Sequence, residues 1–480
     1  MRVKFLPKKD INVEICNIYE DKEAVIIQST DTLQSNTAFN CEALSFKYGI
    51  KPTVYHYPYA NIQTDLKNIQ DSDVLKFSIY YPTDRYRDGN ESYILPDYLS
   101  NTLTQEGADF YGRTIGESKQ TGYPNQGQEL FDYTHGNRGY DVNNSQAGND
   151  GNLGFINEIN YIQNWFKKKF GVYSSASSDR QGKIGSKEIY MPYFMSMRRA
   201  SVDNSLINAY YSDIDRLGFI YKKVNSMWES AFDKEDTSVE DNILVTAINN
   251  ALMVNGMFHD FSHWHRARDG KELKLVELFD LINKTVDNRN VWYASANEAC
   301  EYYWYRQMVK RVRGSFINGK LYLVADFDDE FFRDKIAGID KQLLYDRIRQ
   351  PLSVKVDLTG TILDGKDIKG GGIINLGDNK FIIDIPFNVL GNELQQVEIS
   401  ETTQPIYKNF TKPTVLNYNN GIITTDLPCK AVMFNGDFNA PMTYVKRFNN
   451  FSTNHDFNGF SGTKIGLITE SGVSILHESL

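Results

Sequence analysis

The sequence predicts an α/β protein in which a distorted (β/α) barrel is followed by β-rich C-terminal domains. Two observations support this fold class. Strand-like apolar runs alternate with helical periodicity up to Arg313, as βα repeats require. Beyond Gly314 the helical pattern stops, and short strands separated by turn residues follow. We therefore expect a lead at 1–20, the barrel at 21–313, a β-sandwich-like domain at 314–405 and a β-rich module at 406–480.

The first βαβ unit is visible near the start of the chain. Residues 24–28 form an apolar run of the kind found in buried parallel strands, and the run ends at Ser29-Thr30-Asp31. Residues 38–48 have helical spacing, and Gly49 is a typical helix stop. Residues 52–57 are the next expected strand.

Residues 58–128 are long for a connection inside such a fold. The stretch from 105 to 154 is rich in Gly, Asn and Tyr, so we expect an extended loop beside the active face. Its aromatic residues, Tyr133 among them, could stack on sugar rings; the more common alternative is that they pack the loop onto the barrel. A helix is predicted at 155–170, because its apolar residues recur at helical spacing.

The stretch 243–306 carries the candidate chemistry. A helix at 243–253 leads into an apolar run that brings His259 and Asp260 to its end. A helix at 271–282, a short strand at 291–293 and a helix at 296–313 follow. Polar residues at the carboxyl ends of strands form the active sites of βα folds. The alternative is a loop histidine that is merely exposed or packed.

The C-terminal part shows strand patterns only. Residues 320–324, 351–358 and 381–385 predict the sandwich-like unit. Residues 422–424, 431–434 and 465–468 predict the strands of the last module.

Composition excludes several classes of protein. The chain has 480 residues, of which 41% are hydrophobic and 24% charged, as in ordinary globular proteins. A net charge of −9 argues against a general nucleic-acid binder. The four cysteines are far apart and lack CxxC spacing, so we expect free, buried thiols and neither a zinc finger nor a disulfide framework.

Residues 1–16 contain no apolar core long enough for a secretory signal, and the sequence has no run of about 18 apolar residues, so we expect neither a leader nor membrane insertion. This leaves a cytoplasmic protein or one that leaves by another route, such as within a virus particle. A homo-oligomer or a larger assembly is compatible with the sequence.

Several of these motifs together resemble the polysaccharide deacetylase family, whose NodB-homology fold is a distorted βα barrel. His259-Asp260 is followed by the strand Val291-Trp292-Tyr293-Ala294 and by the helix that carries Tyr302 and Arg306. The segment from Tyr48 to Thr53 matches the end of the family's first helix. The resemblance covers about residues 20–313.

The resemblance implies a set of roles. A divalent metal, zinc in most of the family, would be held by Asp31 and His135. His259 would be the catalytic acid, accompanied by Asp260 and Arg180. The substrate would be a polysaccharide or another glycan. The residues implied to contact it are Trp264, Tyr133 and Trp292.

The sequence departs from the family at two positions. Thr30 stands where the catalytic base is expected, and Gly139 where the second metal histidine is expected. A register shifted by one residue would make Asp31 the base and leave Thr32 at the metal position. His56, Asp132 and Asp141 are candidates to complete a metal site.

Two functions follow from these residues, and a third has little support. The first is metal-dependent hydrolysis of acetyl groups on a cell-surface glycan. The second is a glycan-binding or structural protein that keeps the fold without the chemistry. A glycoside hydrolase would need a distinctive pair of carboxylates, and none stands out.

Overall fold

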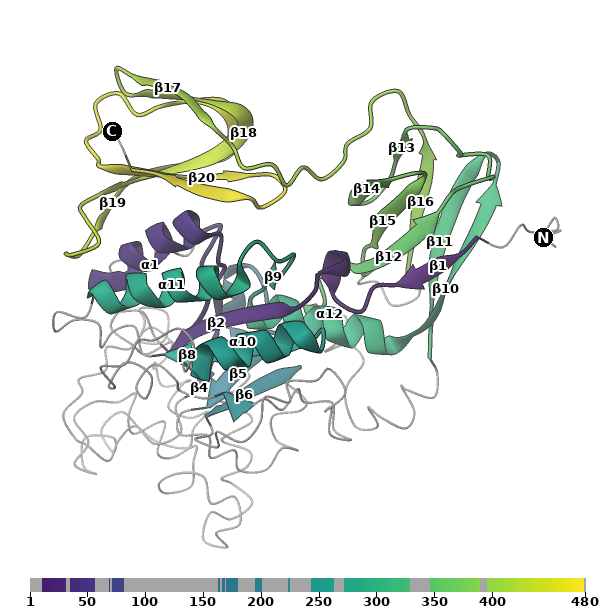
Figure 1. Cartoon of the computed structure of the whole chain (residues 1–480), viewed down its shortest axis with the longest axis horizontal. Coiled ribbons are helices and arrows are strands. Elements are labelled where there is room, and N and C mark those ends of the chain that lie inside the picture. The colour runs from purple at the N-terminus through teal and green to yellow at the C-terminus, as the bar shows by residue number, and fades with distance from the viewer. Residues whose placement is uncertain are drawn as a thin grey trace, which may run out of the picture.

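The structure is a computed structural model. It describes residues 11–31, 35–56, 69, 71–81, 163–164, 166–168, 170–179, 195–200, 223–224, 243–262, 272–328, 346–388 and 395–478. Within this described part, the N-terminal region is mixed α/β and the C-terminal region consists of β-sheets (Figure 1). The predicted succession of a mixed α/β region and a β-rich region is confirmed at this level.

A parallel sheet forms the centre of the N-terminal region. Its strand order is β7-β6-β5-β4-β3-β2-β8, with β9 also paired to β2, and every neighbouring pair is parallel. Cα atoms of β7 and β8, at the two ends of this order, lie within 8 Å of each other. The strands are β2 (Val25–Asp31), β3 (Thr53–His56), β4 (Lys76–Tyr81), β5 (Ala176–Asp179), β6 (Ser196–Ala200), β7 (Lys223–Val224), β8 (Met257–Ser262) and β9 (Trp292–Tyr293).

Three helices pack together beside this sheet. Helix α11 (Glu272–Val286) contacts both α1 (Ser35–Tyr48) and α10 (Ile243–Met253), and α10 packs on β8 (Figure 1). The helix predicted at about 243–253 is confirmed. The apolar stripe of α11 ends in Phe279 and Ile282, both fully buried, as its spacing predicts.

A fourth helix, α12 (Ala296–Met308), is buried on nearly all sides. It begins with a capping box, in which Ser295 and Glu298 exchange side-chain and backbone hydrogen bonds. The four aromatic residues 302–305 are each at most 1% exposed. The predicted helical end at 313 was wrong: the chain leaves the helix at Val309, because residues 309–317 form a strand that pairs with its neighbour.

Behind α12 lie two four-stranded antiparallel sheets. One has the order β1-β12-β15-β14 and the other β10-β11-β16-β13. The N-terminal lead therefore contributes an edge strand to this region, in which Glu14 lies opposite Lys355. The strands are β1 (Val13–Ile15), β10 (Val309–Ile317), β11 (Lys320–Phe327), β12 (Leu352–Asp357), β13 (Ile368–Lys369), β14 (Ile373–Gly377), β15 (Lys380–Ile385) and β16 (Gln395–Glu401).

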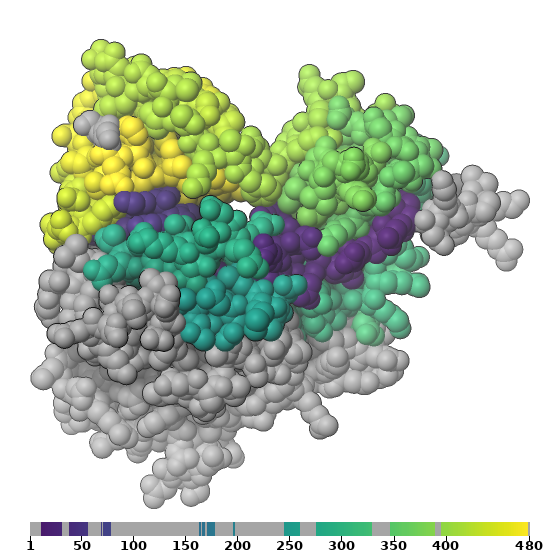
Figure 2. Space-filling view, in the orientation of Figure 1, coloured from purple at the N-terminus to yellow at the C-terminus, as the bar shows by residue number. Residues whose placement is uncertain are grey.

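The last part of the chain forms a five-stranded antiparallel sheet, which we call the C-terminal module. Its long strand β18 pairs with β19 along one edge and with β17 and β20 along the other, and β21 extends β20. Figure 2 shows this module and the two four-stranded sheets as separate masses with a notch between them. The strands are β17 (Val415–Asn419), β18 (Ile422–Asn435), β19 (Thr443–Asp456), β20 (Lys464–Thr469) and β21 (Ser474–His477).

One face of the C-terminal module docks onto α1. Arg447 donates to Glu42 at 2.7 Å, and both side chains are almost fully buried. Asn40 bonds to the backbone of Ala440 and Met442. At Gly466 an added Cβ would lie 2.6 Å from the ring of Phe46, so only glycine permits this close approach. The interface is therefore well packed and specific.

A buried cluster of charges joins three distant segments. Lys408, which precedes the C-terminal module, bonds to Asp384 of β15 at 2.6 Å and to Glu20 of the lead at 2.7 Å. Tyr19 and Ser353 each donate a hydrogen bond to Asp384. An ammonium shared between two carboxylates compensates their burial, which fixes the lead against the β-sheets.

The four cysteines are free and buried, as their spacing predicts. Among the helices in the described ranges, none has the length and apolar character needed to cross a membrane.

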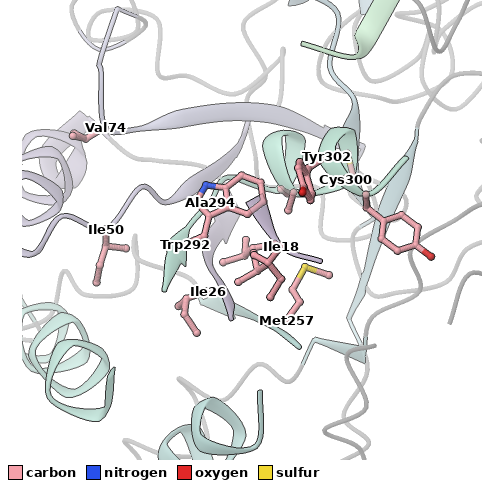
Figure 3. Packing of buried hydrophobic residues seen from close by; sticks show 14 of the residues in the cluster. Ile18, Ile26, Ile50, Val74, Met257, Trp292, Ala294, Cys300 and Tyr302 are labelled. Carbon is pink, nitrogen blue, oxygen red and sulfur yellow. The ribbon is translucent and has the colours of Figure 1, made fainter. Parts of the chain in front are cut away.

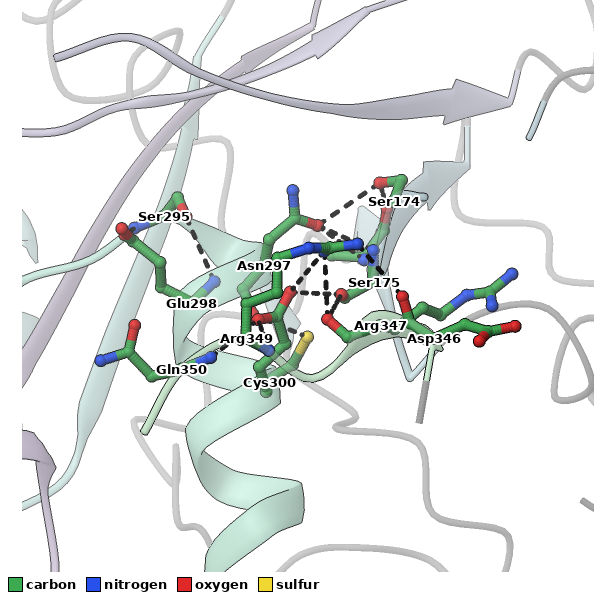
Figure 4. A network of polar contacts seen from close by, with 12 residues as sticks. Ser174, Ser175, Ser295, Asn297, Glu298, Cys300, Asp346, Arg347, Arg349 and Gln350 are labelled. Carbon is green, nitrogen blue, oxygen red and sulfur yellow. Dashed lines mark hydrogen bonds and ion pairs between the residues drawn. The ribbon is translucent and has the colours of Figure 1, made fainter. Parts of the chain in front are cut away.

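Two polar side chains of α12, those of Asn297 and Glu301, hold neighbouring segments together, and Figure 4 shows Asn297 beside Ser174 and Ser175. Asn297 accepts from the backbone N–H of Ser175 and Ala176 and donates to the carbonyl of Phe77, so it ties β4 to β5. Glu301 accepts from the Ser175 hydroxyl and from the backbone N–H of Arg349 at 2.8 Å and of Gln350 at 3.2 Å. Burial raises the pKa of Glu301 to about 7.

The raised pKa of Glu301 predicts a pH dependence of stability. The folded state holds this proton above pH 4.5, where the unfolded chain has released it. The free energy of unfolding should therefore fall by about 3 kcal/mol as pH rises from about 4.5 to about 7. Glu301→Gln should abolish this fall in the free energy of unfolding between about pH 4.5 and pH 7.

Urea unfolding of wild type and variant at several pH values measures the effect. Glu277→Gln, on an exposed carboxyl of α11, is the control and should leave the slope almost unchanged. Parallel stability curves for wild type and Glu301→Gln would contradict the assignment.

Candidate functional site

Three neighbouring strands of the parallel sheet bring polar side chains together. In the order β3-β2-β8, Tyr55 comes from β3, Ser29 from β2 and His259 from β8. His259 lies opposite Ile27, and β8 continues to Ser262. The expectation that the strand ends at His259-Asp260 was therefore wrong, because Phe261 and Ser262 also pair with β2.

Two contacts with described side chains position the imidazole of His259. Its Nε2 atom lies 3.2 Å from Oγ of Ser29, within hydrogen-bond distance. Its ring is stacked on that of Tyr55, with centroids 6.4 Å apart and planes 19° apart. Ser29 and Tyr55 are fully buried, whereas His259 is partly exposed. The histidine therefore contacts buried side chains of the sheet and is itself partly accessible to solvent.

The sequence contained a signal for Ser29 that was not used. Strand β2 begins with three apolar residues and then carries Gln28, Ser29 and Thr30, all 0% exposed. Polar side chains that are buried in a strand need partners, and a change from apolar to polar within a buried run therefore indicates a polar site. The motif comparison directed attention to Asp31 instead.

The described residues include only part of the predicted site. Asp31 is the last residue of β2, with its backbone beside Tyr55 of β3, and Asp260 follows His259 in β8. The side chains of Asp31 and Asp260 are outside the described set. So are four further residues of the prediction, namely His135, Arg180, Trp264 and Tyr133. That Asp31, His135 and His259 converge stays a prediction.

Thr30, which the sequence resemblance assigns to the position of the base, is fully buried in β2, and its backbone lies between Val54 and Ser262. A threonine hydroxyl does not ionise near neutral pH and cannot act as the base. A different group must take the proton of water if the site is catalytic.

Trp292 occupies a place unlike that of a sugar-binding residue. It is 8% exposed, and its ring packs on Tyr19 at 5.0 Å and edge-on to Tyr302 at 5.8 Å. Figure 3 shows it among the apolar side chains of the core, near Ile18 and Ile26. Strand β9 pairs with Val25 and Ile26, at the amino end of β2 and away from Asp31. This position favours a packing role.

The donor atoms around His259 do not by themselves make a zinc site. Within the ranges that the structure describes, no three His, Cys, Asp or Glu side chains are grouped as metal ligands. The described side chains in contact with His259 are those of Ser29 and Tyr55, whereas protein zinc ligands are imidazole, thiolate and carboxylate. A metal would need Asp31 and His135.

The structure is similar to solved structures of two carbohydrate-active proteins. One, from Mycobacterium smegmatis, is described as a polysaccharide deacetylase; it has a TM-score of 0.34 and 10% identity, over 66% of this chain and 99% of that one. The other is the Xyl-CE4 domain of a multidomain xylanase from the hindgut metagenome of Trinervitermes trinervoides, with a TM-score of 0.28 and 12% identity, over 58% and 91%. No protein-family model and no curated protein matches the sequence.

The burial of Trp292 predicts that its removal affects stability. Trp292→Ala should lower the free energy of unfolding by about 3–5 kcal/mol, as truncation of a large core side chain does. Chemical denaturation measures this, and Phe460→Ala, at an exposed aromatic residue of the described part, is the control and should change the free energy of unfolding little. Normal stability combined with lost oligosaccharide binding would instead support the sugar-contact role.

Proposed function

We propose that the chain is a divergent polysaccharide deacetylase-like protein that hydrolyses acetyl groups on a glycan, with His259 as the group that transfers a proton. The proposal includes closure of the parallel sheet into a distorted (β/α) barrel. The single observation that carries it is the His259–Ser29 contact inside this sheet. A partly exposed imidazole with a buried hydroxyl partner is suited to general acid–base work.

In this reaction His259 acts on the leaving group. When the bond between the acetyl carbon and the sugar oxygen or nitrogen breaks, the leaving atom takes up a proton. An imidazolium beside it supplies that proton and becomes neutral. Water provides the oxygen of the acetate product. The neutral ring then regains a proton from solvent before the next turnover.

We propose Asp31 as the carboxylate of the site. Strand alternation assigns it to the same face of β2 as Ser29, two residues earlier. With His135 it would hold a divalent metal such as zinc, which would polarise the acetyl carbonyl and a bound water. In the other register of the motif, Asp31 is itself the base.

A second function is favoured by a specific observation. Thr30 offers a buried, neutral hydroxyl at the base position. A chain without a base would bind a glycan, or serve as part of a larger assembly such as a virion, without hydrolysis. Zinc and activity measurements separate the two functions.

Replacement of His259 tests the catalytic role. His259→Gln should reduce acetate release from N-acetylated chito-oligosaccharide or acetylated xylo-oligosaccharide by about 10²–10⁴-fold, the usual contribution of a proton-transferring group. His455→Gln is the matched control, because His455 is a buried histidine of the C-terminal module. Equal rates for wild type and His259→Gln would refute the acid role.

A zinc titration tests the metal. We expect weak binding by the wild type, because only Asp31 and His135 are proposed ligands, and a further loss in Asp31→Asn. The double variant Thr30→Asp with Gly139→His should bind more tightly, since three or four ligands are usual for zinc. Calorimetry measures all three proteins, with the exposed Asp71→Asn as control. Tight stoichiometric zinc in the wild type would show that another residue completes the site.

A further inference from the structure

We propose that Ser29 is a positioning residue for His259: its Oγ accepts Nε2–H, so that Nδ1 is the ring nitrogen that exchanges the catalytic proton. This inference rests on the proposed function, in which His259 is the acid. Its physical basis is the contact of 3.2 Å between Nε2 and Oγ.

Ser29 and His259, the two residues of this contact, differ in burial. Ser29 is 0% exposed, whereas His259 is partly exposed. The edge of the ring that carries Nε2 therefore lies toward the interior of the sheet. A proton that passes to a substrate must leave from the other nitrogen, Nδ1.

Two contacts together determine where the ring lies. The hydrogen bond to Ser29 of β2 fixes the direction of Nε2. The stacking on Tyr55 of β3, with planes 19° apart, fixes the plane of the ring. Since His259 belongs to β8, on the other side of β2, its ring is held across three adjacent strands.

The donor and acceptor of the His259–Ser29 hydrogen bond follow from the protonation states that His259 passes through in each turnover. An imidazolium has a proton on both nitrogens, so Nε2–H donates to Oγ of Ser29. After Nδ1 gives up its proton, the neutral ring still carries Nε2–H, and the same bond persists. A serine that donated to Nε2 would have to reverse its hydrogen bond in every turnover. The orienting partner of a catalytic histidine thus binds the nitrogen that does not react.

A nucleophilic serine is the alternative use of a Ser–His pair. A hydroxyl that is 0% exposed cannot reach the carbonyl of a bound glycan. The burial of Ser29 therefore favours the positioning role.

The test uses the full chain labelled with [¹⁵N]histidine, and His259→Gln assigns the signal of His259 among the seven histidines. We expect the neutral ring of the wild type to carry its proton on Nε2. In Ser29→Ala the imidazolium loses an acceptor, so the midpoint of the ring titration should fall by about one pH unit. The other titratable residues of β2, β3 and β8, namely Asp31, Tyr55, His56 and Asp260, are not substituted in any of these proteins.

Ser177→Ala is the matched control. Ser177 is also fully buried on a strand of the same sheet, β5, and its hydroxyl has no hydrogen-bond partner among the described atoms. This variant should leave the midpoint of His259 where it is. On the chito-oligosaccharide probe, Ser29→Ala should lower kcat roughly tenfold and leave KM within about twofold.

The outcomes separate this proposal from the proposed function. A neutral wild-type ring with its proton on Nδ1 would overturn the role of Ser29, and this measurement needs no variant. An unchanged or higher midpoint in Ser29→Ala would also overturn it. Absence of acetate release by the wild type would overturn the proposed function, while the ¹⁵N measurement still decides whether Ser29 accepts from Nε2.

Discussion

The requirement that a buried helix satisfy its polar groups determines how the parts of this protein fit together. Helix α12 has almost no solvent-facing side, so its polar side chains find partners in distant segments. Beyond the contacts of Asn297 and Glu301, Tyr302 donates to the carbonyl of Cys16 and Trp304 to that of Met195, each at 2.8 Å. A buried polar group without a partner costs about 1–3 kcal/mol. The lead, β5, β6 and the segment before β12 are therefore fixed against one helix.

Local regularities made part of this fold predictable. The run at 24–28 predicted a buried parallel strand, and the spacing at 243–253 predicted α10 with its bounds, because periodicity directly reports which face is buried. Three features depend on residues far away in the sequence. The lead pairs as β1 with β12, α12 ends where β11 offers a pairing partner, and Trp292 is covered by Tyr19.

In the candidate site, too, one part could be predicted from the local sequence and another depends on distant residues. His259 could be found from its neighbours in the sequence, since an apolar run precedes it. Its partners could not, because Ser29 and Tyr55 are 230 and 204 positions earlier and meet it only through the strand order β3-β2-β8. A hydroxyl partner carries no charge, and it can both donate and accept. A histidine whose partner is a carboxylate would have its charged imidazolium form stabilised more strongly than His259, whose partner is a hydroxyl.

The pairing of β1 with β12 also bears on how the chain folds. Glu14 and Lys355 are opposite each other although 341 residues separate them, so this edge of the sheet cannot form until most of the chain has left the ribosome. Until then the partner edge of β12 is unpaired and open to other strands. A high contact order of this kind slows folding. Expression at lower temperature, or with a chaperone that shields strand edges, should therefore increase the yield of native protein.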